Sequence, residues 1–306
     1  MEKQSYQKYT PKELLEKRAK DKLFNFILEK GSIRGAIVQS TLMVNEMRDN
    51  FELGILESYI LGQSYTAAAL LSSQVKGNDR LTLKISCDGP VGGIVVDSNS
   101  YGEIRGYLKN QSIPVNGVLE NLDISEYLGS GYISIIKYLE NAKQPYEGQV
   151  PLKYRSIAED LANYFNESEQ TPSAFQLSIH YDRAGDITGA GGIFLQALPG
   201  ASESSIENLE NTLLKMESPG KLFSQGFGAD ELVLKEFAEY GPKILESKRV
   251  EFFCRCSEKQ MLTYLTMLPP DDRKDIKENG PFPLEIRCHS CNTRYSISRD
   301  KLQANL

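Results

Sequence analysis

Four cysteines near the C-terminal end of the sequence are the residues whose type and spacing most clearly indicate chemistry. They form two close pairs, Cys254-Arg-Cys256 and Cys288-His-Ser-Cys291, separated by the 31 residues 257–287. Side chains two apart on an extended segment point to the same side, and a Cys-x-x-Cys turn presents two thiolates to one ion. The spacing therefore predicts one zinc ion per chain rather than four unrelated free thiols. The predicted ligands are Cys254, Cys256, Cys288 and Cys291.

A zinc ion with four thiolate ligands has a complete tetrahedral shell. Because no position stays open for an activated water, the site argues against metal-assisted hydrolysis and against an enzyme. His289 lies inside the second pair and is expected outside the ligand set, since four cysteines already suffice. Arginines also flank the ligands, and they either offset the excess negative charge or form solvated surface; the sequence leaves both interpretations open. These are Arg255, Arg287 and Arg294.

A zinc ribbon that binds nucleic acid is one alternative function. Residues 251–306 contain nine Lys and Arg against eight Asp and Glu, and the whole chain carries a net charge of −6. A nucleic-acid module is expected to be more basic, because affinity for the phosphate backbone comes from Lys and Arg. The charge pattern therefore disfavours nucleic acid as a partner.

A thiol–disulfide oxidoreductase is a second alternative. It would place a Cys-x-x-Cys at the start of a helix after a strand, whereas the two pairs here are expected to converge far from the β-rich part of the chain. A redox sensor instead needs zinc-held thiolates with a resolving thiol beside each, and both close pairs supply one. The residues thus favour a thiol switch over a catalytic centre.

Residues 21–199 show the pattern of one mixed α+β domain. Helical stretches at residues 54–75 and 155–165 are inserted between groups of strands instead of alternating strictly with them, which favours α+β over a doubly wound sheet. The strand-like runs are rich in β-branched and aromatic residues. They are Ile33–Gln39, Leu81–Cys87, Gly93–Asp97, Glu103–Leu108, Tyr132–Tyr138 and Phe175–Asp182.

Glycine-rich segments in this domain favour backbone turns over ligand sites. Two near-repeats, Gly31-Ser-Ile-Arg-Gly35 and Gly102-Glu-Ile-Arg-Gly106, each predict a turn glycine, a strand start and a second glycine where backbones approach closely. The run Asp88-Gly-Pro-Val-Gly-Gly93 lacks the Lys-Ser/Thr of a phosphate loop, so it predicts a bent hairpin. The isolated Cys87 is expected to be a small buried core residue rather than a redox partner.

Residues 200–250 change from strand-like runs to short amphipathic patterns, which predict a metastable helical linker. Two short amphipathic patterns, 203–216 and 229–240, are separated by glycine-containing turns. Helices this short are marginal in water, so they must dock on another part of the protein. The linker is followed by residues 251–306, which are predicted to form a small C-terminal zinc-binding domain.

Residues 1–20 are expected to be an N-terminal extension. They are polar and charged and lack the apolar segment of a secretory signal. No stretch of the chain approaches the roughly 20 apolar residues that a membrane helix needs. These features predict a cytoplasmic protein without a membrane partner.

Several of these segments together resemble the heat shock protein 33 family of redox-regulated bacterial chaperones, over nearly the whole chain from residue 21 onward. The most specific are Phe253-Cys-Arg-Cys-Ser257 and Cys288-His-Ser-Cys-Asn-Thr-Arg-Tyr295, at the family's spacing. Upstream, the runs 88–93, 102–107 and 191–200 follow in the family's order. Cys87 stands where no family cysteine is expected, and residues 1–20 lie outside the resemblance; neither departure touches the cysteine quartet.

The resemblance implies an ATP-independent holding chaperone whose reduced, zinc-bound form is inactive. Oxidation would form disulfides Cys254–Cys256 and Cys288–Cys291, release the zinc and unfold the C-terminal region. The protein would then bind unfolding client proteins and protect them from aggregation under oxidative stress and heat. The resemblance also implies that residues 21–199 bind clients and that the oxidised protein forms a homodimer.

Overall fold

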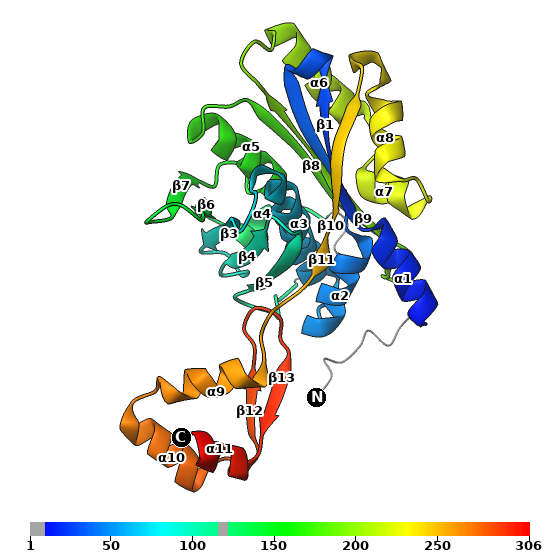
Figure 1. The fold of residues 1–306 in the computed structure, drawn as a ribbon. Helices are drawn as coiled ribbons and strands as arrows, with labels where there is room; N and C mark the ends of the chain where they lie inside the picture. The colour runs from blue at the N-terminus through cyan, green and yellow to red at the C-terminus, as the bar shows by residue number, and fades with distance from the viewer. Residues whose placement is uncertain (1–9, 116–121) are drawn as a thin grey trace.

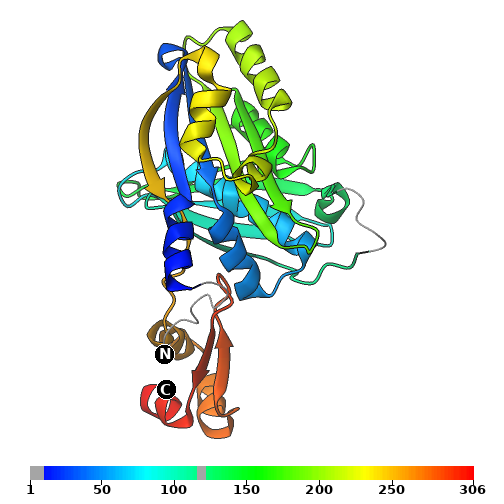
Figure 2. The ribbon, with the colours of Figure 1, turned by 90° about the vertical axis from the view of Figure 1, so that its right-hand side faces the viewer.

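The computed structural model of the chain describes residues 10–115 and 122–306. Two large β-sheets enclose a buried helix, short helices cover the outer face of one sheet, and a small module at the C-terminal end extends away from both sheets (Figures 1 and 2). The predicted α+β class is therefore confirmed. Within the part of the chain that is described, no helix is long and apolar enough to cross a membrane.

The first sheet has five strands, and each pair of neighbours is antiparallel. Its central strands are buried on both faces, which explains why they read as nearly continuous apolar runs. In β2, for example, Val38 faces the core between the sheets, whereas Ile37 faces the outer helices. In spatial order the strands are β10 (Lys243–Arg249), β1 (Lys22–Leu28), β2 (Ile33–Gln39), β9 (Ile187–Ala197) and β8 (Ser173–Tyr181).

The second sheet has six strands and is antiparallel except at one edge, where a two-residue strand pairs in parallel. Strands β3 to β5 alternate between buried and more exposed positions, so this sheet buries one face. In spatial order the strands are β11 (Glu251–Phe252), β5 (Glu103–Leu108), β4 (Ile94–Asn99), β3 (Arg80–Cys87), β6 (Gly131–Tyr138) and β7 (Tyr146–Pro151).

The helix α3 (Ile55–Leu71) lies between the sheets and contacts strands of both. It is apolar nearly all round its circumference, as a helix buried on every side must be. Gly62 lets α2 approach it, since a Cβ there would stand 2.8 Å from Val44. The other helical segments of this part of the chain are α1 (Pro11–Lys20), η1 (Glu29–Gly31), α2 (Thr41–Phe51), η2 (Ser72–Gln74), α4 (Ser125–Leu128) and α5 (Ile157–Glu167).

The predicted linker docks as expected of short helices, but it is not helical throughout. Its helices cover the outer face of the five-stranded sheet, where they bury a second apolar core. Residues 243–249 form β10 instead, because they pair with β1 along the edge of that sheet. The helical segments are α6 (Glu203–Lys215), α7 (Pro219–Ser224), α8 (Ala229–Glu236) and η3 (Ala238–Tyr240).

The C-terminal module has its own two-stranded sheet and its own small core (Figure 1). Its helices contact one another and, through α9, the hairpin. The elements are α9 (Glu258–Thr266), α10 (Pro270–Asn279), β12 (Leu284–Arg287), β13 (Arg294–Ile297) and α11 (Arg299–Asn305).

The chain passes from the first sheet to the second at Val250, which is buried in the core between them. On one side of it Arg249 pairs with β1, and on the other Glu251 pairs with β5. Gly102 is required here, because a Cβ would stand 2.0 Å from the Arg249 carbonyl oxygen. Lys248 Nζ strengthens the junction by donating to the carbonyl oxygens of Ser72 (2.7 Å) and Ser100 (3.0 Å). The segment that leads to the cysteines is thus fastened to both sheets.

Most sequence predictions for the first domain are confirmed. Strands Ile33–Gln39 and Glu103–Leu108 have the predicted bounds, and the glycine run 88–93 joins β3 to β4 as the predicted hairpin. In the second near-repeat, Gly106 is the predicted close-approach glycine, since a Cβ would stand 2.3 Å from the Val95 carbonyl oxygen. Strands β1 and β9 and helix α2 are not among the elements predicted from the sequence.

One buried carboxylate predicts a pH-dependent stability. Asp21 is 2% exposed, and its Oδ2 accepts a hydrogen bond from the Met43 backbone N–H (2.8 Å) at the N-terminus of α2. Burial raises the pKa of Asp21 from 3.8 to about 8. The folded state then binds more protons than the unfolded state between these two values, so this group makes stability fall as pH rises from about 4 to about 8.

We therefore expect Asp21→Asn to remove this part of the pH dependence, at most about 1.4 kcal/mol per pH unit. Urea unfolding at pH 5, 6.5 and 8, followed by circular dichroism, would measure it. Comparing the two proteins cancels the proton dependence of metal binding, which they share. Equal pH slopes for the wild type and the variant would contradict the prediction.

Candidate metal centre

Two backbone features bring the four predicted cysteines together. Cys254 and Cys256 follow β11 on a segment without helix or strand assignment. Cys288 and Cys291 lie in the turn that joins β12 to β13, where the Cys288 N–H donates to Thr293 O (2.9 Å) and the Asn292 N–H donates to Cys288 O (2.7 Å). Asn292 has a φ of 56°, a left-handed conformation that asparagine tolerates better than most residues. The turn therefore points both thiols toward the first pair.

The four Sγ atoms form a cluster of the size that a zinc ion requires. All lie within 4.8 Å of one another, with 3.9 Å between Cys254 and Cys288 and 3.4 Å between Cys256 and Cys291. Sulfur atoms about 2.3 Å from one zinc ion at tetrahedral angles stand roughly 3.8 Å apart. The donor set and its spacing thus fit zinc.

The cysteines are also a large part of the module's core. Each is at most 9% exposed, and together they make up half of the buried cluster that includes Met261, Leu265, Ile297 and Leu302. A module this small buries too little apolar surface to be stable by packing alone. Bound metal supplies folding free energy in such modules, and its removal unfolds many of them. This module is therefore expected to depend on the ion.

Side chains outside the quartet also contact the sulfurs, and one of them comes from a distant part of the sequence. Tyr295 Oη donates to Cys256 Sγ (3.0 Å), and the Thr293 hydroxyl lies 3.1 Å from Cys291 Sγ. Arg105 Nη1 of β5 donates to Cys254 Sγ (3.6 Å). Donors of this kind stabilise thiolate charge and orient the ligands.

The three arginines that flank the cysteines in sequence have other positions. Arg255 pairs with Glu103 (Nε–Oε2, 3.0 Å), and Arg294 pairs with Glu52 (3.1 Å). Arg287 is exposed on β12. The role of Arg105 was not predicted from the sequence, and the only signal for it was the second glycine near-repeat, residues 102–106, which contains it.

His289 lies outside the cysteine cluster, as predicted. Its ring contacts Tyr107 of β5, with 3.7 Å between the centroids. The prediction that the cysteine pairs converge far from the β-rich domain is wrong, because β5 lies directly against both pairs. The lone Cys87 does not belong to the cluster; it is half-buried, and burial raises the pKa of its thiol.

The ionisation of each thiol in the cluster depends on the other three. Hydrogen bonds from Cys256, then from Cys288 and Cys291, hold the pKa of Cys254 far below its usual range. Hydrogen bonds with Cys254, then with Cys256 and Cys291, raise the pKa of Cys288 far above it. One thiolate is therefore favoured by its neighbours, and the accumulated negative charge opposes further ionisation. A divalent cation removes this opposition, so metal binding is coupled to proton release.

Comparison with known proteins gives consistent matches over most of the chain. Residues 21–298 match the family model described as Hsp33 protein. The chain is 35% identical to the 33 kDa chaperonin of Ruminiclostridium cellulolyticum, over 92% of this chain and 97% of that protein. It is 32% identical to the 33 kDa chaperonin of Bacillus cereus, with the same coverage of both chains. The crystal structure of the Thermotoga maritima 33 kDa chaperonin superposes with a TM-score of 0.84 at 28% identity, covering 93% of this chain and 97% of that one.

The cluster predicts a specific loss of metal on substitution of a ligand. We expect Cys291→Ser to lower zinc affinity by more than the 10- to 100-fold typical of changes outside the ligand shell. Cys87→Ser is the matched control and should retain about one zinc per chain. Zinc content after dialysis against a competing chelator, together with protease sensitivity of residues 254–306, would measure both effects. Wild-type zinc content in Cys291→Ser would contradict the four-thiolate site.

Proposed function

This chain belongs to the Hsp33 family of chaperones, and from that premise we propose that it is an ATP-independent holding chaperone switched on by oxidation of its zinc site. In the reduced state Cys254, Cys256, Cys288 and Cys291 would hold the ion, and the protein would be inactive. We propose the cytoplasm as its location, unfolding proteins as its partners, and a homodimer as its oxidised form. Nucleic acid is not among the proposed partners.

One observation carries this proposal: four buried thiols that fit a single zinc ion follow directly after a segment whose helices cover a large apolar face. On that face Phe26, Ile37 and Ile193 are at most 1% exposed. The helical residues that cover them include Phe223, Leu232 and Phe237. Undocking would expose apolar surface on both partners, and such surface binds unfolding proteins without a nucleotide.

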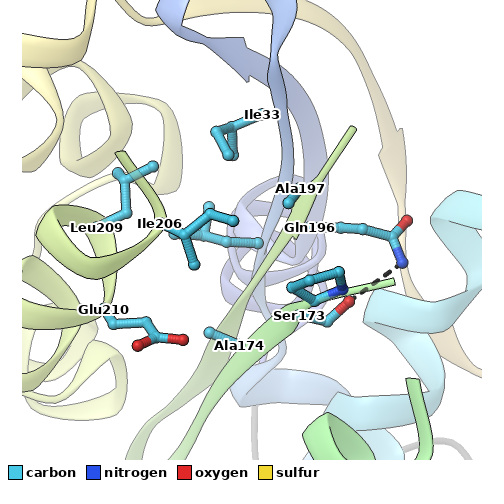
Figure 3. A pocket seen from close by; sticks show the side chains of 10 residues that line it. Ile33, Ser173, Ala174, Gln196, Ala197, Ile206, Leu209 and Glu210 are labelled. Atoms are coloured by element: carbon cyan, nitrogen blue, oxygen red, sulfur yellow. Dashed lines mark hydrogen bonds between the residues drawn. The ribbon is translucent and has the colours of Figure 1, made fainter. Parts of the chain in front are cut away.

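The covering helices are held by few contacts where α6 meets the sheet. A pocket of about 20 Å³ lies between α6 and strands β8 and β9. Figure 3 shows Ile206 and Leu209 of α6 on one side of it and Ala174 and Ala197 of the strands on the other. The residue after Leu213 on the same helix, Leu214, is 83% exposed. These features support α6 as the least firmly docked helix of the segment.

The proposed switch is a balanced two-electron oxidation of each cysteine pair. A thiolate attacks hydrogen peroxide and forms a sulfenic acid with release of hydroxide; the second thiolate displaces a further hydroxide and closes the disulfide. Two peroxides thus oxidise four thiols to two disulfides, which the family resemblance implies to be Cys254–Cys256 and Cys288–Cys291. Since neither disulfide retains a thiolate, no ligand set remains for zinc, and the module loses the free energy that the ion supplied.

The junction at Val250 supports transmission of this change. Cys254 is only four residues beyond Val250, and β10 lies immediately before it. Loss of structure after residue 253 would remove the contacts of Cys254 and Ser290 with β5, leaving the two-residue strand β11 as the remaining pairing at that edge. One end of the segment 243–252 would then be held less firmly. The helices α6 to α8 precede that segment directly, so the proposal links loss of zinc to their release.

We expect peroxide at mildly elevated temperature to release about one zinc per chain and, with the same time course, to create the capacity to suppress aggregation of a denatured client. Zinc release would be followed with a colorimetric chelator and aggregation by light scattering. Equal suppression by the reduced, zinc-loaded protein would exclude the switch. Salt-sensitive binding of an oligonucleotide would favour a zinc ribbon, and turnover of a disulfide substrate would favour an oxidoreductase.

We also expect weakened docking of α6 to bypass part of the switch. Leu213→Ala removes a side chain that is 6% exposed, which costs about 2–5 kcal/mol at a buried site. The reduced, zinc-loaded variant should then suppress aggregation in part without peroxide. Leu214→Ala is the matched control, because it makes the same change one residue later at an exposed site and should behave as the wild type. Full inactivity of the reduced Leu213→Ala protein would show that α6 does not hold the chaperone off.

A further inference from the structure

The loop between the second pair of ligands makes contacts that metal binding does not require. The two residues between Cys288 and Cys291 both contact β5 of the N-terminal sheet. The Gly106 N–H donates to Ser290 O (3.1 Å), and the rings of Tyr107 and His289 lie 3.7 Å apart. The spacer of the Cys-x-x-Cys turn is therefore part of an interface between the module and the N-terminal domain.

The C-terminal end of α2 holds the other side of the same loop. Asn50 Nδ2 donates to Cys291 O, and in return Asn292 Nδ2 donates to Asn50 O (2.9 Å). The Asn50 carbonyl is among the last four of α2, which have no partner within a helix. The loop thus donates a hydrogen bond to a free carbonyl at the end of the helix. The helix in turn donates one to the backbone carbonyl of Cys291. Arg294 and Glu52 add an exposed ion pair beside this contact.

The first cysteine pair is attached to the same strand. The Glu251 N–H donates to the carbonyl oxygen of Gly102, the residue before β5 (2.9 Å), and the Phe253 N–H donates to that of Ile104 in β5 (3.0 Å). Between these positions and Gly106, the side chain of Glu103 binds Arg255, and that of Arg105 reaches Cys254 Sγ. Each residue of the near-repeat 102–106 therefore contacts the segment that holds the cysteines.

This arrangement completes an exposed sheet edge. β11 pairs with β5 for only two residues, and the cysteine loop then accepts the next outward-facing N–H, that of Gly106. An unpaired strand edge is a site where backbone groups lack partners. The docked loop also carries two of the buried thiols, since Cys288 is 8% exposed and Cys291 is 2% exposed. The same contacts therefore provide a hydrogen-bond partner for the strand edge and fix the loop that carries the sulfurs.

We propose that docking of the loop 288–292 on β5 and on the end of α2 controls how fast the cysteine site loses its metal, with Asn50 and Tyr107 as positioning residues. The loop conformation that presents two thiols to one ion is also the conformation that fits the N-terminal domain. Binding of the ion and docking then stabilise each other by the same free energy. This inference rests on the proposed function only where chaperone activity is the readout.

The test measures zinc transfer from the reduced full-length protein to a chromogenic chelator. Asn50→Ala removes the donor to Cys291 O and should speed transfer about 10-fold, the lower end of the range for groups that orient metal ligands. Asn279→Ala is the matched control; it makes the same change at the end of α10, where the side chain bonds only Asp275 of its own helix among the contacts described (2.7 Å). Its rate should stay within twofold of the wild type.

A double-mutant cycle tests the ring contact separately from folding. Tyr107→Ala and His289→Ala should each speed transfer, and the double variant should be no faster than the faster single variant, because both remove one shared contact. Tyr107→Phe keeps the ring and should restore the wild-type rate. Since His289 is exposed, its substitution leaves the core intact. Additive effects of the two alanine substitutions would show that the rings act independently and would overturn their part in the proposal.

Hydrogen exchange of the amides of residues 288–292 gives a readout that does not depend on chaperone activity. Exchange there should rise in Asn50→Ala, whereas exchange in β3 and β6 should not change. Wild-type rates of both exchange and zinc transfer in Asn50→Ala and Tyr107→Ala would overturn the proposal. If these variants lose zinc faster but the oxidised wild type fails to protect a client, the docking inference stands and the proposed chaperone switch fails.

Discussion

The main constraint on the structure is the electrostatic repulsion between four thiols that would be ionised in one buried cluster. Their Sγ atoms lie within 4.8 Å of one another, and charges removed from water at that distance are tolerated only when they are compensated. A bound divalent cation would supply most of the compensation, and donors such as Arg105 and Tyr295 supply part of it. Because the cysteines also form half of the module's core, compensation of the thiolate charge and folding of the module depend on each other. A change in the thiols is therefore expected to become a change in structure.

The strand β5 connects the cysteine cluster to the rest of the molecule. One of its neighbours is β4 of the six-stranded sheet, and on its other side lie β11 and the ligand loop. The chain reaches that position only by crossing from the first sheet to the second at Val250, immediately after the docked helical segment. The order of elements places three things in sequence: a covered apolar face, a junction fastened to both sheets, and a metal-dependent module. In our proposal, loss of the module releases the junction and then the cover.

The two apolar cores differ in how they are closed, and this difference suits the proposed function. The core between the sheets surrounds α3 and is bounded by long antiparallel ladders. The outer core is closed by short helices, of which α6 buries only Leu209 and Leu213. Short helices owe their stability to docking, so the outer core is the part that can open while the inner one persists. A stable domain with a removable cover is what reversible client binding would need.

The sequence by itself determined the candidate metal cluster and much of the local structure. The spacing of Cys254, Cys256, Cys288 and Cys291 identified the cluster, since ligand geometry restricts spacing; alternation identified strands such as Glu103–Leu108. Strand β9 could not be predicted in this way, because it is buried on both faces and shows no alternation. Only the tertiary structure decided that residues 243–249 form an edge strand and that Arg105 reaches Cys254 across 149 positions of the chain. Contacts of this kind depend on how two segments that are distant in sequence pack against each other. No local pattern in either segment predicts that packing.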